Sequence, residues 1–315
     1  MKMVSIVRKQ LPMRRVLLSL VPILVFSVYL YGWRVLSLLA VVMILGYGVE
    51  YLFERGRKAV PSESFLVTCV LFTLTLPPNI PYWIAAVGIL FGLTFGKQVF
   101  GGFGRNVFNP ALVGRCFIYV AFPNPMTVNW VQPFSGFPGG FGSWAPEFAD
   151  AMARATPMLQ ANAGAADYSY LQLFLGNTAG SIGESSAPLI LLAAVYLIYR
   201  KVANWKVMAS MALSMLALNG ILYLFKLEGV HDPLFSFLTG GFLFALVFMA
   251  TDPVTAPKED RARIVYGVLI GIITVIIRSF SLFTEGVMFA ILMVNAFVPL
   301  LDISMKSLGR KAVSS

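Results

Sequence analysis

Apolar segments of nearly membrane-spanning length follow one another along most of this chain, separated by short polar loops. A helix needs about 20 predominantly apolar residues to cross a bilayer, and lipid-exposed backbone must satisfy its own hydrogen bonds. Charged residues make up 12% of the chain, about half the share of a soluble domain. We therefore expect an all-α polytopic membrane protein. The predicted spans are 16–32, 35–53, 64–77, 82–97, 106–122, 188–200, 207–225, 233–251, 264–278 and 287–303.

The ten predicted spans divide into two halves. Ser64-Phe65-Leu66 opens the third span and Ser236-Phe237-Leu238 opens the eighth, and both copies run into prolines. Because the copies lie five spans apart, an odd number, they predict two inverted five-helix repeats; chance similarity of two Leu/Phe-rich stretches is the alternative. Several spans are short, which predicts broken or tilted helices. The first is followed directly by a second span, which predicts a transmembrane helix rather than a cleavable signal peptide. The predicted parts are an N-terminal segment 1–15, a first repeat 16–122, a loop 123–187, a second repeat 188–303 and a tail 304–315.

The basic residues lie in short loops on one side of these spans. The formal net charge is +10, and nineteen of the 24 lysines and arginines fall on one side, Lys97 among them, against four on the other, including Arg278. This asymmetry is the positive-inside pattern of a membrane protein rather than the basic face of a nucleic-acid-binding protein. It predicts cytoplasmic termini and places the 123–187 loop on the outer face.

Polar residues interrupt the apolar spans of both halves. Such residues are costly inside a membrane unless they are paired or serve a function. Sites of inverted-repeat proteins form at such interruptions. We therefore predict a cofactor pocket or ion path, with contacts between helices and ordinary loop ends as the alternative. The glycines of 101–104 lack a βαβ setting, so they predict a tight turn or close helix packing rather than a nucleotide site. The candidates are Asn106, Asn109 and Arg115 in the first half and Asp252, Glu285, Asn295 and Asp302 in the second, with Glu50 and Asn219 as further polar residues inside spans.

No metal site is predicted. Cys69 and Cys116 have no CxxC spacing and cannot alone ligate an iron–sulfur cluster; we expect both to be packing residues. His231 has no metal-ligand spacing around it and is expected at a helix end.

The 123–187 loop is long for a connection and rich in Gly, Pro and aromatic residues, which is typical of a functional loop. Within it, Thr156 follows Asp150 by six residues. Its hydroxyl is a candidate attachment point for a covalent cofactor. The alternative is an ordinary helix-capping threonine with Pro157 at the first helical position.

Two stretches of the chain resemble a known family. Phe100-Gly101-Gly102 through Asn106, Asn109-Pro110-Ala111-Leu112 and Gly114-Arg115, with Met249 to Val254, are similar to the D component of the Rnf ion-translocating oxidoreductase and to the B component of the sodium-pumping NADH:quinone oxidoreductase. The resemblance covers nearly the whole chain. It implies a urea-transporter-like inverted-repeat fold and an FMN joined through its phosphate to the threonine of an outer-face Asp-x-x-Ser/Thr-Gly-Ala-Thr motif.

Carried onto this chain, the motif falls on Asp150, Ala155 and Thr156, whereas Ala153 and Arg154 depart from it. The Ala-Thr-Pro ending and the lack of a long N-terminal extension favour the Rnf type. The resemblance also implies a non-covalent riboflavin in the membrane, with Asn106 and Asn109 in the region that would bind it. Asn106, Asn109 and Arg115 are candidate contacts of this second flavin or of the FMN.

Together these expectations describe a flavin-bearing subunit of a ferredoxin:NAD⁺ oxidoreductase-type ion pump in a prokaryotic inner membrane. It has no complete active site of its own, and a flavin supplies the redox chemistry. Its expected partners are the other subunits, with iron–sulfur and flavin groups among them, and a flavin transferase. A small-solute channel of the same fold without a redox role, or a structural scaffold, is the alternative.

Overall fold

All regular elements of the described chain are helical. The computed structural model describes residues 7–128, 130–146, 156–164, 168–184, 186–281, 283 and 285–314. Within these ranges the only β-type pairing is an isolated bridge between Arg8 and Ser62. The all-α prediction is therefore confirmed.

The first half contains α1 (Leu11–Tyr31), α2 (Arg34–Gly56), α3 (Ser64–Leu74), α4 (Tyr82–Leu93), the π-helical turn η1 (Thr94–Gln98) and α5 (Pro110–Ala121). The connecting loop carries α6 (Pro123–Thr127), the 3₁₀ turn η2 (Gly139–Gly142), α7 (Pro157–Asn162) and α8 (Tyr170–Leu175). The second half contains α9 (Ala187–Tyr199), α10 (Trp205–Leu224), α11 (Pro233–Leu238), α12 (Phe242–Phe244), the π-helical turn η4 (Ala245–Met249), α13 (Asp260–Phe280), α14 (Gly286–Asn295) and α15 (Val298–Ser314).

Four described helices, α1, α2, α10 and α13, are long and apolar enough to cross a membrane. A fifth crossing is possible if α14 and α15, which meet at a 55° bend, act as one broken span. The chain is thus a multi-pass membrane protein, while the number ten stays a prediction. Broken helices were expected: the range 233–251 splits into α11, α12 and η4, and the range 287–303 splits at the bend.

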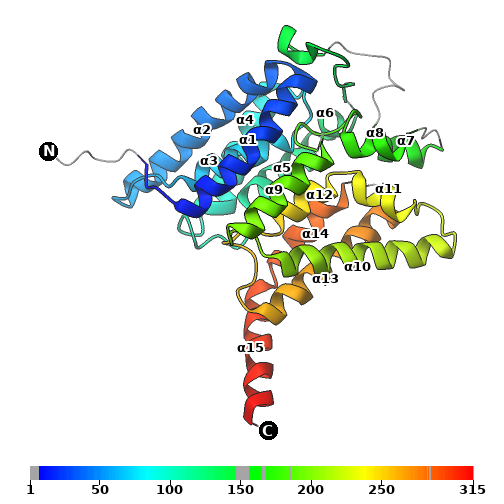
Figure 1. Ribbon diagram of the computed structural model, residues 1–315. Coiled ribbons are helices and arrows are strands. Elements are labelled where there is room, and N and C mark those ends of the chain that lie inside the picture. The colour runs from blue at the N-terminus through cyan, green and yellow to red at the C-terminus, as the bar shows by residue number, and fades with distance from the viewer. Residues whose placement is uncertain are drawn as a thin grey trace.

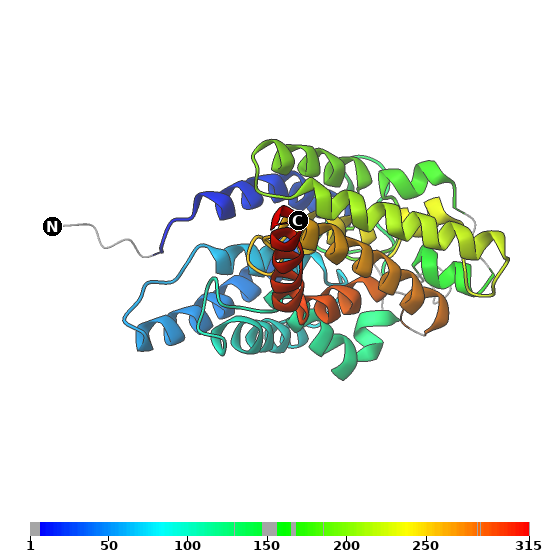
Figure 2. The ribbon, with the colours of Figure 1, turned by 90° about the horizontal axis from the view of Figure 1, so that it is seen from below.

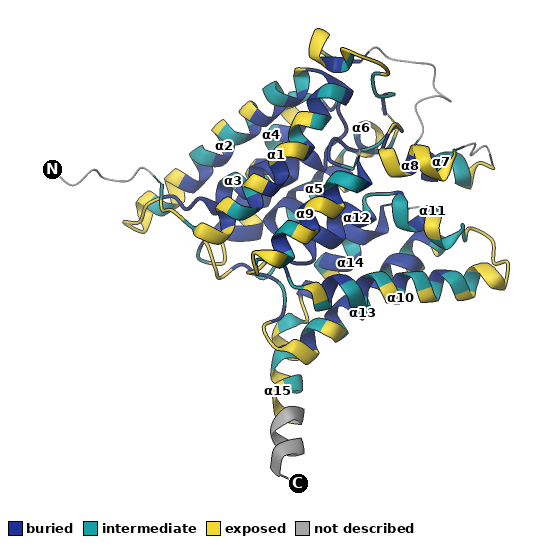
Figure 3. Cartoon of the chain, viewed as in Figure 1, coloured by how far each residue is buried: buried dark blue, intermediate teal, exposed yellow. Residues whose placement is uncertain are grey.

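The two halves lie next to each other, with the first at the left and the second at the right in both ribbon views (Figures 1 and 2). The short helices α3 and α12 are almost wholly buried and α5 and α14 are mostly buried, whereas the long helices show one exposed face (Figure 3). The polar interruptions of the sequence therefore belong to the buried centre, and the long spans form the wall.

Small residues let the helices of each half approach closely. In the first half, Gly92 of α4 faces the backbone of α5, and a Cβ there would lie 2.5 Å from the carbonyl oxygen of Pro110. In the second half, a Cβ on Gly271 of α13 would lie 2.0 Å from the hydroxyl of Ser214 on α10. Within lipid the hydrophobic effect does not favour helix association, so van der Waals contact between closely packed helices contributes much of the stabilising free energy.

We expect Gly271→Leu to destabilise the protein by about 3 kcal/mol, because the side chain would force α10 and α13 apart. The thermal midpoint in detergent measures this loss. Gly48→Leu on α2 is the matched control, because a Cβ at Gly48 meets nothing within 4 Å. Equal thermal midpoints for the two variants would show that close packing of α10 against α13 does not contribute to stability.

Two cations counted as loop residues are buried, which corrects the sequence-based assignment. Lys97 is 2% exposed and lies on the π turn η1. Arg278 is 8% exposed near the end of α13. Each lies near the end of a helical segment, where hydropathy places a loop but the tertiary fold places the protein interior.

Candidate functional site

Buried backbone at the break between α11 and α12 is held by Arg278. Gly240 and Gly241 both have positive φ there (62° and 67°), which is a conformation that glycine adopts without strain. The Arg278 guanidinium donates to the carbonyls of Ser236 (2.8 Å), Thr239 (3.2 Å) and Gly240 (2.6 Å). Arg278 thus satisfies carbonyls that the broken helix leaves free.

Two π-helical turns, one from each half, face a single cavity. Lys97 of η1 and Val247 and Phe248 of η4 line it. π-Helical turns are rare and occur frequently at functional sites. Their convergence therefore marks this cavity, which we call the Asn109 pocket, as a candidate site.

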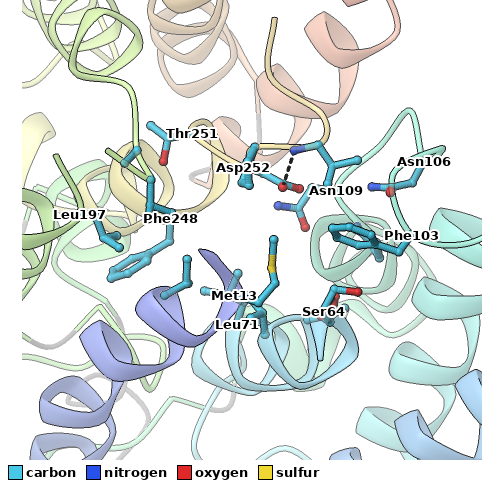
Figure 4. Close-up of a pocket in the computed structure, with 18 of the residues that line it drawn as sticks. Met13, Ser64, Leu71, Phe103, Asn106, Asn109, Leu197, Phe248, Thr251 and Asp252 are labelled. Carbon is cyan, nitrogen blue, oxygen red and sulfur yellow. Dashed lines mark hydrogen bonds between the residues drawn. The ribbon is translucent and has the colours of Figure 1, made fainter. Parts of the chain in front are cut away.

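The Asn109 pocket has a volume of about 620 Å³ including its solvent-open part, within the usual size of ligand sites. Asn106, Asn109 and Asp252 lie along one wall, with Met13 and Leu71 facing them (Figure 4). Polar residues from both halves of the chain therefore line this one cavity.

Each polar residue of that wall is held by its neighbours. Asn109 caps α5 by accepting from the backbone N–H of Ala111 (3.0 Å), and its Nδ2 lies 3.6 Å from the Met249 sulfur. Asp252 accepts from the Val254 N–H (3.1 Å) and the Thr255 hydroxyl (3.3 Å). The wall is therefore pre-formed.

The cation of the Asn109 pocket is already neutralised. Lys97 Nζ donates to both carboxylate oxygens of Glu50 (2.8 and 2.9 Å) and to the Ser64 hydroxyl (2.8 Å). Glu50 also accepts from Gln98 Nε2 (2.6 Å), and its side chain is wholly buried. Lys97 is the only Lys or Arg among the described residues that line the pocket, so the pocket offers no free positive charge to a phosphate.

A second cavity, the Thr156 pocket, lies under the loop between the halves. Its volume is about 650 Å³ including the solvent-open part, and Thr156, Thr178, Glu184, Phe242 and Glu285 are among its lining residues. Thr156 is the N-cap of α7: its hydroxyl oxygen accepts from the Leu159 N–H (3.4 Å), and Pro157 begins the helix. The capping role expected as the alternative is thus present, and it leaves the hydroxyl at the edge of a cavity. Asp150 and Ala155 lie outside the described residues.

A buried charge network lies beside the Thr156 pocket, and its carboxylates Glu184 and Glu285 line that pocket. Arg115 of α5 donates to the carboxylate of Glu285 and to the Ser181 hydroxyl (3.2 Å), and it lies 3.9 Å from Glu184. The fold therefore joins Arg115 and Glu285, which are 170 residues apart in the chain. Arg115 is six residues after Asn109 on the same helix, or roughly 9 Å along its axis, so α5 connects the two pockets.

The loop segment that carries Thr156 docks on the connection between α10 and α11. His231 shares a 2.6 Å hydrogen bond with Asn162 of α7, and Tyr170 of α8 donates to Asp232 (3.0 Å). Partial burial lowers the pKa of His231, so the ring is neutral at physiological pH. His231 lies two residues before the start of α11, close to the helix end where it was expected, and helps to position the loop.

Two predicted candidates lie away from both pockets. Asn295 is wholly buried and accepts from the Tyr266 hydroxyl (2.7 Å), which is a contact between α13 and α14. Asp302 accepts from the backbone N–H groups of Lys258 (3.1 Å) and Glu259 (3.0 Å) just before α13. The alternative of helix contacts and loop ends describes these two residues better than an ion path does.

Lys97 and Glu184 line the two pockets but were not predicted as site residues. Lys97 followed an apolar span and was counted with the loops, and Glu184 stands in a polar stretch with no motif around it. Cys69 is buried and Cys116 partly buried, both as free thiols, in line with packing roles. Among the described residues no group of three His, Cys, Asp or Glu side chains could hold a metal ion.

Comparison with known proteins identifies relatives over nearly the whole chain. The model of the NQR2, RnfD, RnfE family matches residues 6–308. The B component of the Na⁺-translocating NADH-quinone reductase of Pseudomonas paraeruginosa is 40% identical over 273 residues, which are 82% of this chain and 64% of that protein. The B components of the same reductase from Azotobacter vinelandii (41%; 85% of this chain, 66% of that protein) and Klebsiella pneumoniae (39%; 83% and 64%) are similar. The chain thus spans a little under two thirds of the length of these relatives.

Proposed function

This chain belongs to the NQR2, RnfD, RnfE family, and we propose that it is the flavin-bearing membrane subunit of an ion-translocating electron-transport complex. The observation that carries the proposal is the position of Thr156, which lines a pocket of ligand size together with Glu184 and Glu285, two carboxylates of a buried charge network. The resemblance to the family expects a flavin at this residue.

In this proposal Thr156 carries FMN through a phosphoester, and the Thr156 pocket receives the flavin ring. An ester oxygen still accepts a hydrogen bond, so the cap made by Leu159 N–H survives attachment. Phe242 and Phe244 offer apolar surface for a ring, and Glu285 and Glu184 offer acceptors for its N–H. Bound FMN supplies one-electron chemistry, while these residues position it and exclude water. A flavin transferase attaches it, reading a motif that includes Asp150 and Ala155.

Peptide mass mapping of the protein from its native host tests this proposal. We expect the peptide containing Thr156 to carry the mass of FMN less one water, lost when the phosphoester forms. An unmodified peptide would overturn the proposal. A colourless protein that conducts a small neutral solute would support the channel alternative instead.

The Asn109 pocket is proposed to hold a second flavin without a phosphate, namely riboflavin. It is mostly apolar with a few fixed amides, as pockets for uncharged ligands are. Its one cation is paired with Glu50, which disfavours the phosphate of FMN. Arg115 lines neither pocket; it pairs with Glu285 and lies 3.9 Å from Glu184, both of which line the Thr156 pocket. We therefore assign it to positioning these carboxylates near the covalent flavin rather than to contact with riboflavin.

We expect Asn109→Ser to lower the flavin released by acid precipitation at least tenfold while the covalent flavin stays. Serine keeps the cap of α5 but removes the amide donors. Chromatography of the extract measures the released flavin. Asn219→Ser, at a buried asparagine bonded to the His231 carbonyl (2.9 Å) outside the pocket, is the control. Full riboflavin content in Asn109→Ser would contradict the assignment.

The two halves are proposed to be inverted repeats, with cytoplasmic termini and an outer Thr156 loop. Their internal packing supports this: α4 packs on α2 and α5, as α13 packs on α10 and α14. The halves meet through corresponding pairs, α1 with α9 and α5 with α14. In this orientation, the Asn109 pocket opens toward the cytoplasm and the Thr156 pocket outward in a prokaryotic inner membrane.

Electrons are proposed to arrive from and leave to neighbouring subunits that hold iron–sulfur and flavin groups, as in a ferredoxin:NAD⁺ oxidoreductase of the Rnf type. The described residues contain no cysteine set for a cluster. Na⁺ or H⁺ movement would involve Asp252, which lines the Asn109 pocket, and Glu285, which lines the Thr156 pocket.

A further inference from the structure

A basic cleft opens at the end of the molecule where α2 stops, near the N-terminus at the left of Figure 1. We call it the basic cleft and define it by Arg8, Lys9, Glu54, Arg57, Phe103 and Arg105. Its volume is about 1600 Å³ including its solvent-open part. Four cations and one carboxylate give it a net positive charge.

Part of that positive charge has no partner. Arg57 is occupied by Glu54 (3.0 Å) and by the side chain and carbonyl oxygens of Gln98 (2.5 and 2.6 Å). Arg8 and Arg105 are exposed and make no side-chain hydrogen bond or ion pair within the described chain. The backbone of Arg8 is held to Pro61 (2.7 Å), so its side chain projects from a fixed position. The cleft is therefore built to receive an anion.

An apolar groove lies on the membrane-spanning surface beside this cleft. We call it the aromatic groove and define it by Phe91, Phe95, Phe100, Val113, Phe117 and Val120. Its volume is about 960 Å³ including the open side, and the stacked rings of Phe91 and Phe117 lie 3.9 Å apart. From Val113 to Val120 it follows α5 for roughly 10 Å, a direction suited to an extended hydrocarbon chain.

The cleft and the groove share one loop. Phe100 lines the groove and Gly101, the next residue, lines the cleft. The Arg105 side chain lies over Gly101, since a Cβ there would be 3.0 Å from Arg105 Cδ. The basic cleft, with its unpaired arginines, therefore adjoins one end of the aromatic groove.

We propose that the basic cleft and the aromatic groove together bind one anionic glycerophospholipid. Its phosphate binds Arg8 and Arg105, and one acyl chain lies in the aromatic groove. A soluble anion has no acyl chain to bury in the aromatic groove. A zwitterionic lipid has no net negative charge, so it gains little binding energy from the unpaired arginines. The cleft faces the headgroup depth of a bilayer because α2, a full-length span, ends there. Of the residues that define this site, only Phe103 also lines a flavin pocket, the Asn109 pocket. No variant tested below changes Phe103, so the lipid site stands or falls independently of the proposed function.

Native mass spectrometry of the full-length chain in a neutral detergent tests the site with palmitoyl-oleoyl phosphatidylglycerol and phosphatidylcholine. We expect the parent to prefer phosphatidylglycerol and Arg8→Gln/Arg105→Gln to bind it about 25-fold more weakly. Each cation near a membrane surface contributes about 1 kcal/mol, or about fivefold. The control is Lys201→Gln/Arg261→Gln, which removes two exposed cations elsewhere. Equal weakening in the control, or no weakening in the double variant, would overturn the proposal.

A second pair of variants tests the groove. Val120→Trp places a bulky ring in the groove at a residue 65% exposed, so folding is retained, and Val195→Trp on α9 is matched at 66%. We expect only Val120→Trp to lose bound phosphatidylglycerol, by about tenfold. If sn-glycerol 3-phosphate displaces the lipid from the parent at equal concentration, the cleft binds only the headgroup anion and the lipid site is refuted.

Discussion

Thr156→Ala is expected to remove covalent flavin from this protein completely. An alanine side chain has no oxygen that could form a phosphoester. Among the described threonines, only Thr156 matches the threonine of the family motif. In-gel fluorescence after denaturation measures the loss, because only a covalent flavin stays with the chain. If the protein works in electron transfer as proposed, turnover of the isolated complex falls by at least a hundredfold in the same variant.

Two controls separate attachment from folding. Thr178→Ala removes another hydroxyl of the Thr156 pocket and should keep full fluorescence. Thr156→Ser keeps both an oxygen for the ester and the cap of α7, so it should keep part of the flavin. Persistent fluorescence in Thr156→Ala would place the covalent flavin on another residue. A non-fluorescent variant with normal turnover would favour the scaffold interpretation.

Lys97→Met is expected to be the most destabilising single change at the Asn109 pocket. It would leave Glu50 as a wholly buried, uncompensated charge without the two hydrogen bonds that Lys97 donates. Removing one partner of a buried ion pair costs about 3–5 kcal/mol, whereas replacing both partners costs far less. Glu50→Gln/Lys97→Met should therefore recover most of the lost stability.

A double-mutant cycle on thermal unfolding in detergent measures this coupling. Lys206 and Asp260 form the matched exposed pair, at 2.5 Å with side-chain exposures of 29% and 57%. Exposed pairs contribute about 1 kcal/mol or less, so their cycle should give a much smaller coupling. Equal coupling energies for the two pairs would show that the Glu50–Lys97 pair is hydrated rather than buried in protein.

Local sequence chemistry accounts for several structural details. Asn109-Pro110 begins α5, inside the predicted span 106–122, because an asparagine cap followed by proline satisfies the first turn. The glycines at 101, 102 and 104 do form a turn, with φ of 106°, 92° and 85°. A Cβ at Gly102 would also meet Arg57 and Glu54 at 2.8 Å. These features depend on neighbours within a few residues, which a sequence displays directly.

The placement of charges was predicted less well. Counting cations by loop treats every span as one straight crossing, and it therefore put Lys97 and Arg278 in loops. Both are buried. Lys97 pairs with the Glu50 carboxylate of α2, and Arg278 donates to backbone carbonyls at the break between α11 and α12. Asp302 was a candidate for an ion path because of its type, yet its partners are the backbone amides that precede α13.

The sequence by itself determined the helical membrane class, the family and the threonine expected to carry a flavin, because composition, apolar length and motif are properties of contiguous residues. The tertiary structure alone decided which polar groups meet: Glu50 with Lys97, Arg115 with Glu285, and Asn109 with Asp252 in one pocket. Such pairs join residues 47 to 170 positions apart. They form because a charge inside the bilayer is stable only beside a partner, and the packing of whole helices selects that partner.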